Sequence, residues 1–532
     1  MNKTNKDNIF NTLSHWKNFR FKLLIQGVLV GVFSGFIVVF YRLVLEKAEG
    51  LRHFILTLDI DKYKLIPMWF SIVIILAYIV GLLIQKEPLI SGSGIPQVEA
   101  LLLRKINMNW FKIIIKKIIG GVISIGVGLS LGREGPSIQL GAAAGQGVSK
   151  LFKKNKMEEK YLITSGASAG LAAAFNAPLA GIMFSLEEVH KHFSPLILLP
   201  AMSASLTADF ISKHFFGLKP VFNFGNVLVM PLENYGYIII LGIVVGVFGA
   251  LYNYTLLKTQ QVYVEQKWLP VKFRPMIPFL IAAVLAFLLP EVLGGGHSLI
   301  ESLVHGSFTV KMLLIILFVK FVFSMLSYGS GAPGGIFFPL LVLGALTGAI
   351  YGNVLVNYFD FSPEYINNFI ILAMAGYFTA IVRAPITGSI LITEMTGSFS
   401  HLLAVSVIAL VAYAVADLLK AEPIYESLLE RLLKNNGENE FEGECKNKIV
   451  IELPVFLDSE MDGKTIKELN LPIGCLLVGI KRGEREIIPK GDTIIYAKDS
   501  LYVLVDENKA AVTKEKLLVM GTKLFIEIGK TL

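Results

Sequence analysis

The chain has 532 residues, of which 54% are hydrophobic and only 17% are charged, and it carries a net charge of +8. A soluble domain usually has about 25% charged residues, so this composition excludes an ordinary water-soluble protein for most of the chain. No basic patch is interleaved with aromatic residues, which argues against a nucleic-acid partner. We therefore interpret the positive charge as a mark of membrane topology.

The first 22 residues, MNKTNKDNIFNTLSHWKNFRFK, are polar and basic. They do not have a secretory signal pattern, because the apolar stretch that follows is too long for the core of a signal peptide. Lysine and arginine beside a membrane helix favour the cytoplasmic side. We therefore expect residues 1–22 to be cytoplasmic, together with the basic loop KLFKKNKMEEK at 150–160.

Apolar runs that could cross a bilayer core of about 30 Å follow along the chain. They occupy residues 24–45, 66–84, 235–256, 276–293, 309–328 and 402–419. Other apolar segments, at 161–187 and 368–392, are interrupted by glycine or proline. These patterns predict an all-α polytopic protein of the cell membrane over residues 23–435.

The membrane part contains an internal repeat, over about 23–215 and 235–430. Three pairs of segments match in the same order: GVLVGVFSG with GIVVGVFGA, GREGP with GIFFP, and AGLAAAFNAPLAGIMFSLEE with AGYFTAIVRAPITGSILITE. Two repeats with interrupted helices at matching positions indicate a transporter, whose site lies between the repeats near the membrane centre.

Three segments have the form of a helix that begins inside the membrane: SGSGIP at 91–96, GREGP at 132–136 and GIFFP at 335–339. The free amides at a helix start attract anions. Glycine lets a ligand approach the backbone, and proline fits the first turn. Any one such segment can also be an ordinary turn. The glycines and prolines concerned are Gly92, Gly94, Pro96, Gly132, Gly135, Pro136, Gly335 and Pro339.

GSGIP, GREGP and GGIFFP stand in the order and spacing of the CLC family of chloride channels and chloride/proton antiporters, and EPIY at 422–425 extends the match. The chain resembles that family over about residues 20–435. The resemblance implies an inverted two-repeat fold with broken helices and a homodimer with one anion pathway per subunit. It also implies chloride as the transported anion, and no cofactor besides the transported ions.

The resemblance further implies roles for single residues. Glu134 corresponds to the external gating glutamate, whose carboxylate occupies the anion site and leaves it when protonated. Ser93 and Tyr425 correspond to hydroxyl ligands of chloride, and the amides of Ile336 and Phe337 complete the site. The alternatives are a helix N-cap for Ser93 and a membrane-interface anchor for Tyr425.

The segment FSLEEVHKHF at 184–193 holds two adjacent glutamates. In the antiporter branch of the CLC family, the second of them transfers protons on the inner side, and here that residue is Glu188. A solvated helix end is the alternative. Glu187 aligns with Glu394 of the second repeat, which favours a structural role for that pair.

The composition changes near residue 435, where a polar, acidic linker at 436–447 precedes a small cytoplasmic α+β domain at 448–532. Its pattern predicts strands at 449–456, 475–482, 493–497 and 501–505 and a short helix in DGKTIKELNL. Residues from about 448 to 507 resemble the C-terminal subdomain of RCK domains, also called TrkA-C-like. That resemblance implies dimerisation and the sensing of an unidentified small ligand. The two cysteines, Cys445 and Cys475, do not have the spacing of a metal site.

We expect a chloride/proton antiporter, with a passive chloride channel of the same fold as the alternative. A potassium-transport component would need a carbonyl-lined filter of the TVGYG kind, and the sequence contains none. An enzyme would need a nucleophile–base arrangement, and the membrane part shows no such pattern.

Overall fold

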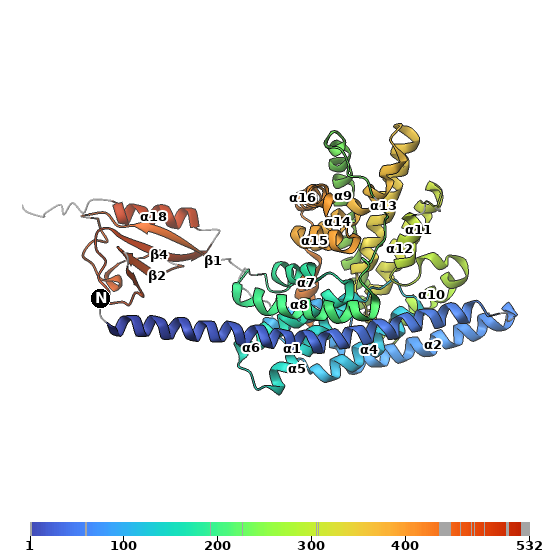
Figure 1. Cartoon of the computed structure of the whole chain (residues 1–532), viewed down its shortest axis with the longest axis horizontal. Helices are drawn as coiled ribbons and strands as arrows, with labels where there is room; N and C mark the ends of the chain where they lie inside the picture. The colour runs from blue at the N-terminus through green and yellow to red at the C-terminus, as the bar shows by residue number, and fades with distance from the viewer. Residues whose placement is uncertain are drawn as a thin grey trace, which may run out of the picture. The chain divides into compact units, whose positions relative to one another are not determined.

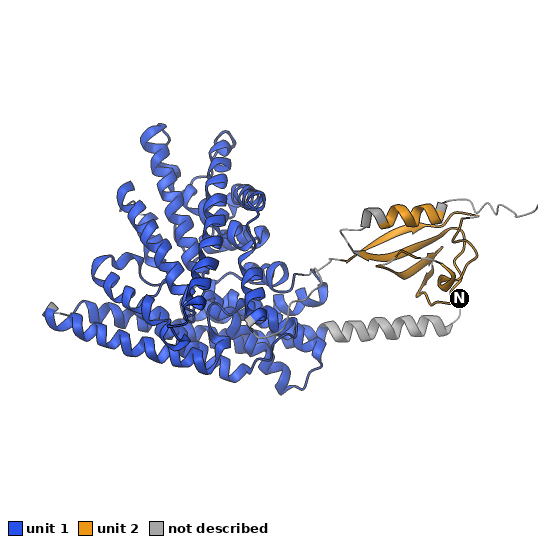
Figure 2. Ribbon diagram, turned by 180° about the vertical axis from the view of Figure 1, so that it is seen from behind, with its two compact units in different colours: residues 1–436 blue, residues 437–532 orange. Residues whose placement is uncertain are grey.

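The computed structural model describes residues 3–522, except for 59–60, 192, 226, 305, 307, 436–447, 458, 470, 473, 484 and 507–509. The chain divides into two compact units, residues 1–436 and 437–532 (Figure 2). The division lies beside the predicted change near residue 435. The predicted linker at 436–447, with Cys445, lies outside the described residues.

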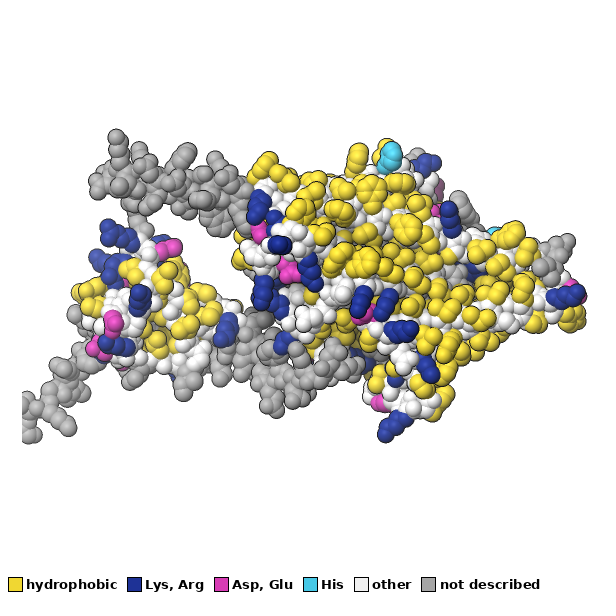
Figure 3. All heavy atoms as spheres, turned by 90° about the horizontal axis from the view of Figure 1, so that it is seen from below, with side chains coloured by type: hydrophobic (Ala, Val, Ile, Leu, Met, Phe, Trp, Pro, Cys, Tyr) yellow, Lys and Arg dark blue, Asp and Glu magenta, His cyan; other side chains and the backbone are white. Residues whose placement is uncertain are grey.

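The first unit is built from helices (Figure 1). Among the described residues, nine helical segments are long and apolar enough to cross a membrane. The segments in α13 and α14 are mostly buried within the unit, whereas half or less of the apolar window of each of the other seven is buried. Figure 3 shows hydrophobic side chains over most of one face, with lysine and arginine mainly toward its rim. The helices are α1 (Lys3–Leu56), α2 (Lys62–Lys86), α3 (Ile95–Leu102), α4 (Trp110–Val127), α5 (Glu134–Leu151), α6 (Lys156–Phe175), α7 (Pro178–Phe184), α8 (Pro195–Phe216), α9 (Tyr235–Glu265), α10 (Met276–Leu288), α11 (His297–Val304), α12 (Val310–Gly329), α13 (Phe337–Tyr358), α14 (Ile366–Val382), α15 (Pro385–Thr396), α16 (Leu402–Leu418) and α17 (Ile424–Asn435).

All six uninterrupted apolar runs predicted from the sequence lie in helices, namely α1, α2, α9, α10, α12 and α16. The predicted run at 276–293 extends too far, because α10 ends at Leu288 and Pro290 begins a separate 3-10 turn. The polar N-terminal segment is continuous with the first membrane helix, since α1 begins at Lys3.

The two interrupted segments are broken helices. A break before Pro178 separates α6 from α7, and a break before Pro385 separates α14 from α15. Asn176 and Arg383 take positive φ angles of 54° and 71° at these breaks. The chain therefore turns in the same way at equivalent places of the two repeats, and the proline that follows starts the new helix.

Glycine lets helices of the first repeat touch through their backbones. A Cβ on Gly141 of α5 would lie 2.1 Å from the carbonyl oxygen of Gly166 in α6, and a Cβ on Gly166 would lie 2.1 Å from that of Gly141. No other residue type fits at either position without moving a helix. Small residues at such contacts are typical of membrane helix packing.

The second unit has a four-stranded antiparallel sheet of order β1-β4-β2-β3. Apolar side chains on one sheet face, among them Ile451, Leu453 and Val503, form a core with Leu517 of α18. The elements are β1 (Lys448–Pro454), β2 (Cys475–Arg482), β3 (Arg485–Ile487), β4 (Asp499–Asp506) and α18 (Ala510–Thr522). The predicted strands at 449–456, 475–482 and 501–505 correspond to β1, β2 and β4.

Two predictions for this unit are met only in part. In the segment 493–497, Ile494 forms only an isolated antiparallel bridge to Thr465. The pairing does not continue, because the amides of Tyr496 and Ala497 donate to the carboxylates of Asp499 and Asp462. DGKTIKELNL forms only a 3-10 turn at Ile466–Glu468. The sequence analysis also missed β3, which has three residues, and α18.

Candidate functional site

Three loops, one before each of α3, α5 and α13, are joined by backbone hydrogen bonds. Gly132 and Gly335 each donate an amide to the other's carbonyl oxygen at 2.7 Å, which makes an antiparallel bridge between the repeats. Gly334 donates to Gly92, and Gly92 donates to Gly331, at 3.0 and 3.3 Å. Irregular backbone survives within a membrane only where protein or water satisfies it, and here the loops satisfy one another.

A buried lysine supports a loop in each repeat. The Lys117 Nζ donates to the carbonyl oxygens of Ile90 and Gly92 at 2.9 and 2.7 Å. Lys320 occupies the equivalent place in the second repeat, and its Nζ donates to Val292 and Gly294 at 2.8 and 2.7 Å. Both side chains are fully buried. The repeats therefore use the same device to hold the backbone before α3 and before α11.

Glu134 is the first residue of α5, and its side chain is fully buried. Neither carboxylate oxygen has a hydrogen-bond partner among the described residues. The nearest cation is Arg133, whose Nε lies 4.0 Å from Glu134 Oε1 and whose Nη1 lies 3.6 Å from Glu46 Oε1. A Cβ on Gly132 would lie 2.3 Å from Glu134 Oε2. The carboxylate therefore folds back over the loop at the amino end of its own helix.

Glu134 lines a cavity of about 460 Å³. The wall carries more basic than acidic side chains, so it favours the entry of anions. Arg42 is anchored in this wall by bonds from Nη1 to Ala173 O and Ser212 Oγ, at 2.6 and 2.8 Å. The basic residues are Arg42, Arg52, Arg133 and Lys219, and the acidic ones are Glu46, Glu49 and Glu134.

Ser93 and Tyr425 are both buried near the start of a helix. Ile95 N donates to Ser93 Oγ at 3.3 Å, but the N-cap residue of α3 is Gly94, so Ser93 precedes the cap. A Cβ on Gly135 would lie 2.8 Å from Ser93 Cβ, which brings Ser93 against the first turn of α5. Tyr425 is fully buried, unlike an anchor at the membrane surface, and its hydroxyl has no partner among the described residues.

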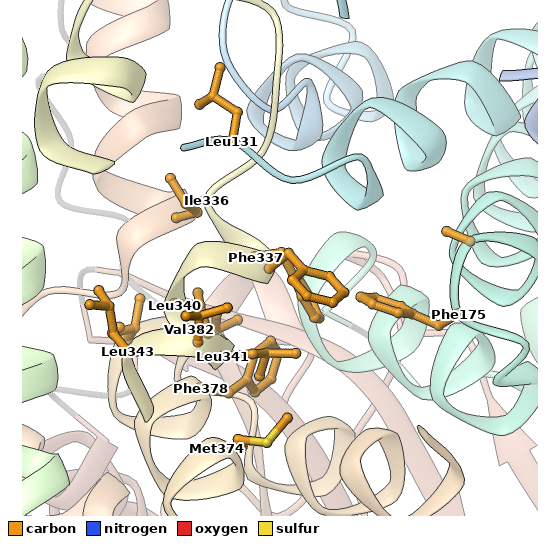
Figure 4. Close-up of a cluster of buried hydrophobic side chains, with 14 of the residues drawn as sticks. Leu131, Phe175, Ile336, Phe337, Leu340, Leu341, Leu343, Met374, Phe378 and Val382 are labelled. Atoms are coloured by element: carbon orange, nitrogen blue, oxygen red, sulfur yellow. The ribbon is translucent and has the colours of Figure 1, made fainter. Parts of the chain in front are cut away.

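Aromatic side chains surround the start of α13. Phe337 packs against Phe378 and Phe175, with ring centroids 4.8 and 5.1 Å apart (Figure 4). Phe184 lies between Phe337 and Tyr425, with its centroid 6.4 Å from each. The first amides of a helix have no acceptor within the helix, and in α13 the first backbone bond is from Leu340 N to Ile336 O. The amides of Ile336 and Phe337 thus begin a helix enclosed by aromatic rings.

Glu188 lies in a single π-helical turn, Ser185–Val189, that follows α7. Such turns are rare and occur mostly at functional sites. Glu188 is 5% exposed, and its Oε1 has no partner among the described residues. It is therefore a buried carboxylate, and not the solvated helix end that was its alternative.

A second buried carboxylate, Glu99 of α3, lies close enough to Glu188 for their charges to interact. Both of its oxygens also have no hydrogen-bond partner among the described residues. Nearby, Lys191 forms an ion pair with Glu426. The sequence analysis missed Glu99, although a carboxylate in the short apolar helix IPQVEALL was a usable signal.

The structural role predicted for Glu187 and Glu394 is confirmed. Glu187 accepts hydrogen bonds from the amides of Ile386 and Thr387 at 3.2 and 2.7 Å, at the start of α15. Glu394 accepts from Leu179 and Ala180 at 3.2 and 2.8 Å, at the start of α7. Each glutamate caps a helix of the other repeat. Such reciprocal contacts are those of a two-fold axis between the repeats, and α5 and α13 run from their shared bridge toward opposite sides (Figure 1).

No group of three or more His, Cys, Asp or Glu side chains that could hold a metal ion occurs in the part of the chain that the structure describes. The arrangement can hold small anions through helix amides and hydroxyls, and it can hold protons on Glu134, Glu188 and Glu99. Arg42, Arg52, Lys219 and His297 were not predicted from the sequence; they come from α1, the loop after α8 and the start of α11 to line the cavity.

Residues 76–417 match the family described as voltage gated chloride channel, and residues 450–518 match the TrkA-C domain. The H(+)/Cl(-) exchange transporter ClcA of Vibrio cholerae serotype O1 (strain M66-2) is 35% identical over 425 residues, which cover 78% of this chain and 90% of that protein. ClcA of Vibrio parahaemolyticus serotype O3:K6 is 34% identical over 429 residues, with 78% and 91% covered.

The crystal structure of a slow cyanobacterial Cl-/H+ antiporter is similar in fold, with a TM-score of 0.74 and 28% identity. The match covers 79% of this chain and 99% of that one.

Proposed function

The chain belongs to the voltage gated chloride channel family, and on this premise we propose that it moves chloride across a membrane in exchange for protons. The observation that carries the proposal is the carboxylate of Glu134, which is fully buried at the amino end of α5 and whose two oxygens accept no hydrogen bond among the described residues. A carboxylate is an anion when ionised and neutral when protonated. Inside a membrane it can therefore couple the binding of an anion to the uptake of a proton. Two proteins named H(+)/Cl(-) exchange transporter are 34% and 35% identical to this chain, which supports the same reaction.

Glu134 acts as the gate. When ionised, its carboxylate lies at the helix amides and the cationic cavity wall, where it takes the place of chloride. When protonated, it loses that attraction and yields the place to chloride. Because one site holds either the carboxylate or the anion, chloride entry and proton uptake are linked.

Chloride binds deeper, to the hydroxyls of Ser93 and Tyr425 and the amides of Ile336 and Phe337. These groups replace part of the hydration shell of the ion without a fixed positive charge. An ion can therefore enter and leave, which transport requires. The unpartnered hydroxyl of Tyr425 supports this assignment, since a buried polar group normally has a hydrogen-bond partner.

Glu188 passes protons between the inner solution and Glu134. Its burial in a π-helical turn, with Oε1 unpartnered among the described residues, supports this role. Glu99 lies close to Glu188 and holds a second proton there. The ion pair of Lys191 and Glu426 balances the charge of these carboxylates at the inner end.

The remaining expectations extend this proposal. The protein is a homodimer in the cell membrane, both termini are cytoplasmic, and it needs no cofactor besides the transported ions. The 437–532 unit is a cytoplasmic regulatory domain that binds an unidentified small ligand and no nucleic acid. The basic loop at 150–160 supports the orientation.

Flux through reconstituted vesicles tests the function. Purified protein is placed in liposomes that contain an outward chloride gradient and no proton gradient, and external pH is followed with an electrode. An antiporter takes protons into the vesicles as chloride leaves, and a proton ionophore collapses the resulting gradient. Chloride efflux without uphill proton movement would instead establish a passive channel.

A further inference from the structure

A second cavity, of about 440 Å³, lies beside α1, away from the Glu134 site. One side is the stretch of α1 that begins at Phe21, and the other is the loop between α5 and α6. Most of the wall is apolar, with Phe21, Ile25 and Phe152 among its members. Phe21 and Phe152 are more than half exposed, so the cavity opens where the protein meets its surroundings.

Gln26 is the unusual member of this wall. Its side chain is 95% buried, since only 5% is exposed, and neither Oε1 nor Nε2 has a hydrogen-bond partner among the described residues. A buried amide without a partner is costly, and no protein group in the described part of the chain satisfies this one. An amide of this kind that lines a cavity indicates a polar ligand group.

Two lysines make the polar end of the cavity basic. Lys22 Nζ bonds to Glu158 Oε1 at 2.8 Å, so its charge is already shared. Lys154 forms no ion pair with a carboxylate among the described residues, and its Nζ lies 5.8 Å from the centre of the Phe152 ring. The charge of Lys154 interacts with that of Glu158 without a direct ion pair, and Lys154 lines the same cavity as Gln26. We therefore assign Lys154 as the cation for a ligand.

The loop around the cavity resembles a segment at a membrane surface. Leu151, Phe152 and Met157 are 67%, 54% and 62% exposed. Exposed lysines at 150, 153 and 156 alternate with them. A protein segment that contacts anionic lipid usually combines two features. Its apolar side chains reach the acyl chains, and its lysines lie at the level of the headgroups.

We propose that this cavity binds one anionic phospholipid. The phosphate lies at Lys154 Nζ and Gln26 Nε2, and an acyl chain follows the wall formed by Phe21, Ile25 and Phe152. The apolar wall favours a lipid over free phosphate, and the unpaired lysine favours an anionic headgroup over a zwitterionic one. In the proposed orientation, the lipid comes from the cytoplasmic leaflet.

Native mass spectrometry of the full chain in detergent tests the site. Phosphatidylglycerol and phosphatidylcholine with identical acyl chains are titrated separately, and the dissociation constant of the first bound lipid is measured. We expect tighter binding of phosphatidylglycerol. Lys154→Ala should weaken it about fivefold, the effect of one lysine near an anionic headgroup, and Gln26→Leu should weaken it by a similar factor.

Lys156→Ala is the matched control, because Lys156 is exposed at the first position of α6, two residues after Lys154, carries the same charge and does not line the cavity. Its affinity for phosphatidylglycerol should equal that of the unaltered protein. Equal loss in Lys154→Ala and Lys156→Ala would show general charge attraction and overturn the proposal. So would equal binding of the two lipids, or displacement of phosphatidylglycerol by millimolar inorganic phosphate. Lipid binding is measured without flux, so its outcome is independent of the antiport test.

Discussion

The two repeats are alike in framework and different in the first turn of the helices that begin at their shared bridge. GREGP and GIFFP are equivalent segments, and their first glycines, Gly132 and Gly335, bond to each other across the repeat interface. Glu134 of the first repeat corresponds to Phe337 of the second. One repeat thus places a buried carboxylate at the start of α5, whereas the other places an aromatic ring within van der Waals reach of Phe175 and Phe378 at the start of α13.

The parts that the repeats share are those that hold the backbone. Lys117 and Lys320 each bond two carbonyl oxygens before a short helix. Glu187 and Glu394 each cap a helix of the opposite repeat. The symmetric contacts are therefore those that satisfy the free ends of the broken helices, which both repeats contain. The proposed proton transfer needs only one carboxylate at this place, so Glu134 has no carboxylate counterpart in the second repeat.

Glu134→Gln should have the largest effect. The amide has similar size but cannot take up or release a proton, so proton flux should fall about 100-fold or more, while chloride flux continues. Liposome recordings of both ions measure the ratio. Phe337→Leu, the change at the equivalent residue, is the control and should keep proton coupling. Loss of coupling in both variants, or in neither, would contradict the asymmetry.

Glu188→Gln should have the next largest effect, and the adjacent Glu187→Gln separates the two roles. With Glu188→Gln, proton flux should fall about tenfold or more and chloride flux should persist. Glu187→Gln keeps an oxygen that accepts the amides of Ile386 and Thr387, so coupling should be unchanged and stability should fall by about 1 kcal/mol. Equal proton fluxes in the two variants would remove Glu188 from the proton path.

Lys117→Met and Lys320→Met test the shared framework. Each change leaves two buried carbonyl oxygens without their donor, which should cost about 2–5 kcal/mol. Thermal unfolding of the purified protein, followed by fluorescence-detected size exclusion, should show similar decreases in melting temperature for both. A large decrease for one lysine and none for the other would show that the repeats are not supported alike.

Removal of residues 437–532 should have the smallest effect on transport. No residue of the proposed pathway belongs to that unit, and its hydrophobic core is separate from that of residues 1–436. The truncated protein should keep the same number of chloride ions per proton, measured from reversal potentials in liposomes. A changed ratio would mean that the C-terminal unit takes part in the exchange itself.

Much of the membrane unit could be predicted from the sequence. A helix in lipid satisfies its own backbone hydrogen bonds. Its side chains are apolar over the thickness of the membrane, so it appears in the sequence as a long apolar run. The breaks before Pro178 and Pro385 were equally visible, since proline cannot continue the preceding helix. The C-terminal unit was harder. The pairing of 493–497 stops after the bridge at Ile494, where the carboxylates of Asp462 and Asp499 accept the next amides, and local alternation does not reveal these acceptors.

The candidate site could be predicted where one short motif holds both the functional side chain and the glycines and proline of a helix start, as in GREGP and GSGIP. Glu99 was missed because its burial depends on the packing of α3 against other helices. Arg42, Arg52 and Lys219 were missed for the same reason. Arg42 and Arg52 lie on α1 and Lys219 follows α8, and only the folded unit places them around one cavity.

The sequence alone determined that the chain is a membrane protein of two repeats, with helices that begin inside the membrane at glycine- and proline-rich segments. These properties follow from local composition, because lipid penalises unpaired backbone everywhere along the chain. The packing of the two repeats was needed to show that Gly132 bonds to Gly335, that Glu187 and Glu394 each cap a helix of the other repeat, and that the oxygens of Glu134 accept no hydrogen bond among the described residues. Such contacts join residues about 200 positions apart, and they arise when the two repeats pack and exclude water from between them.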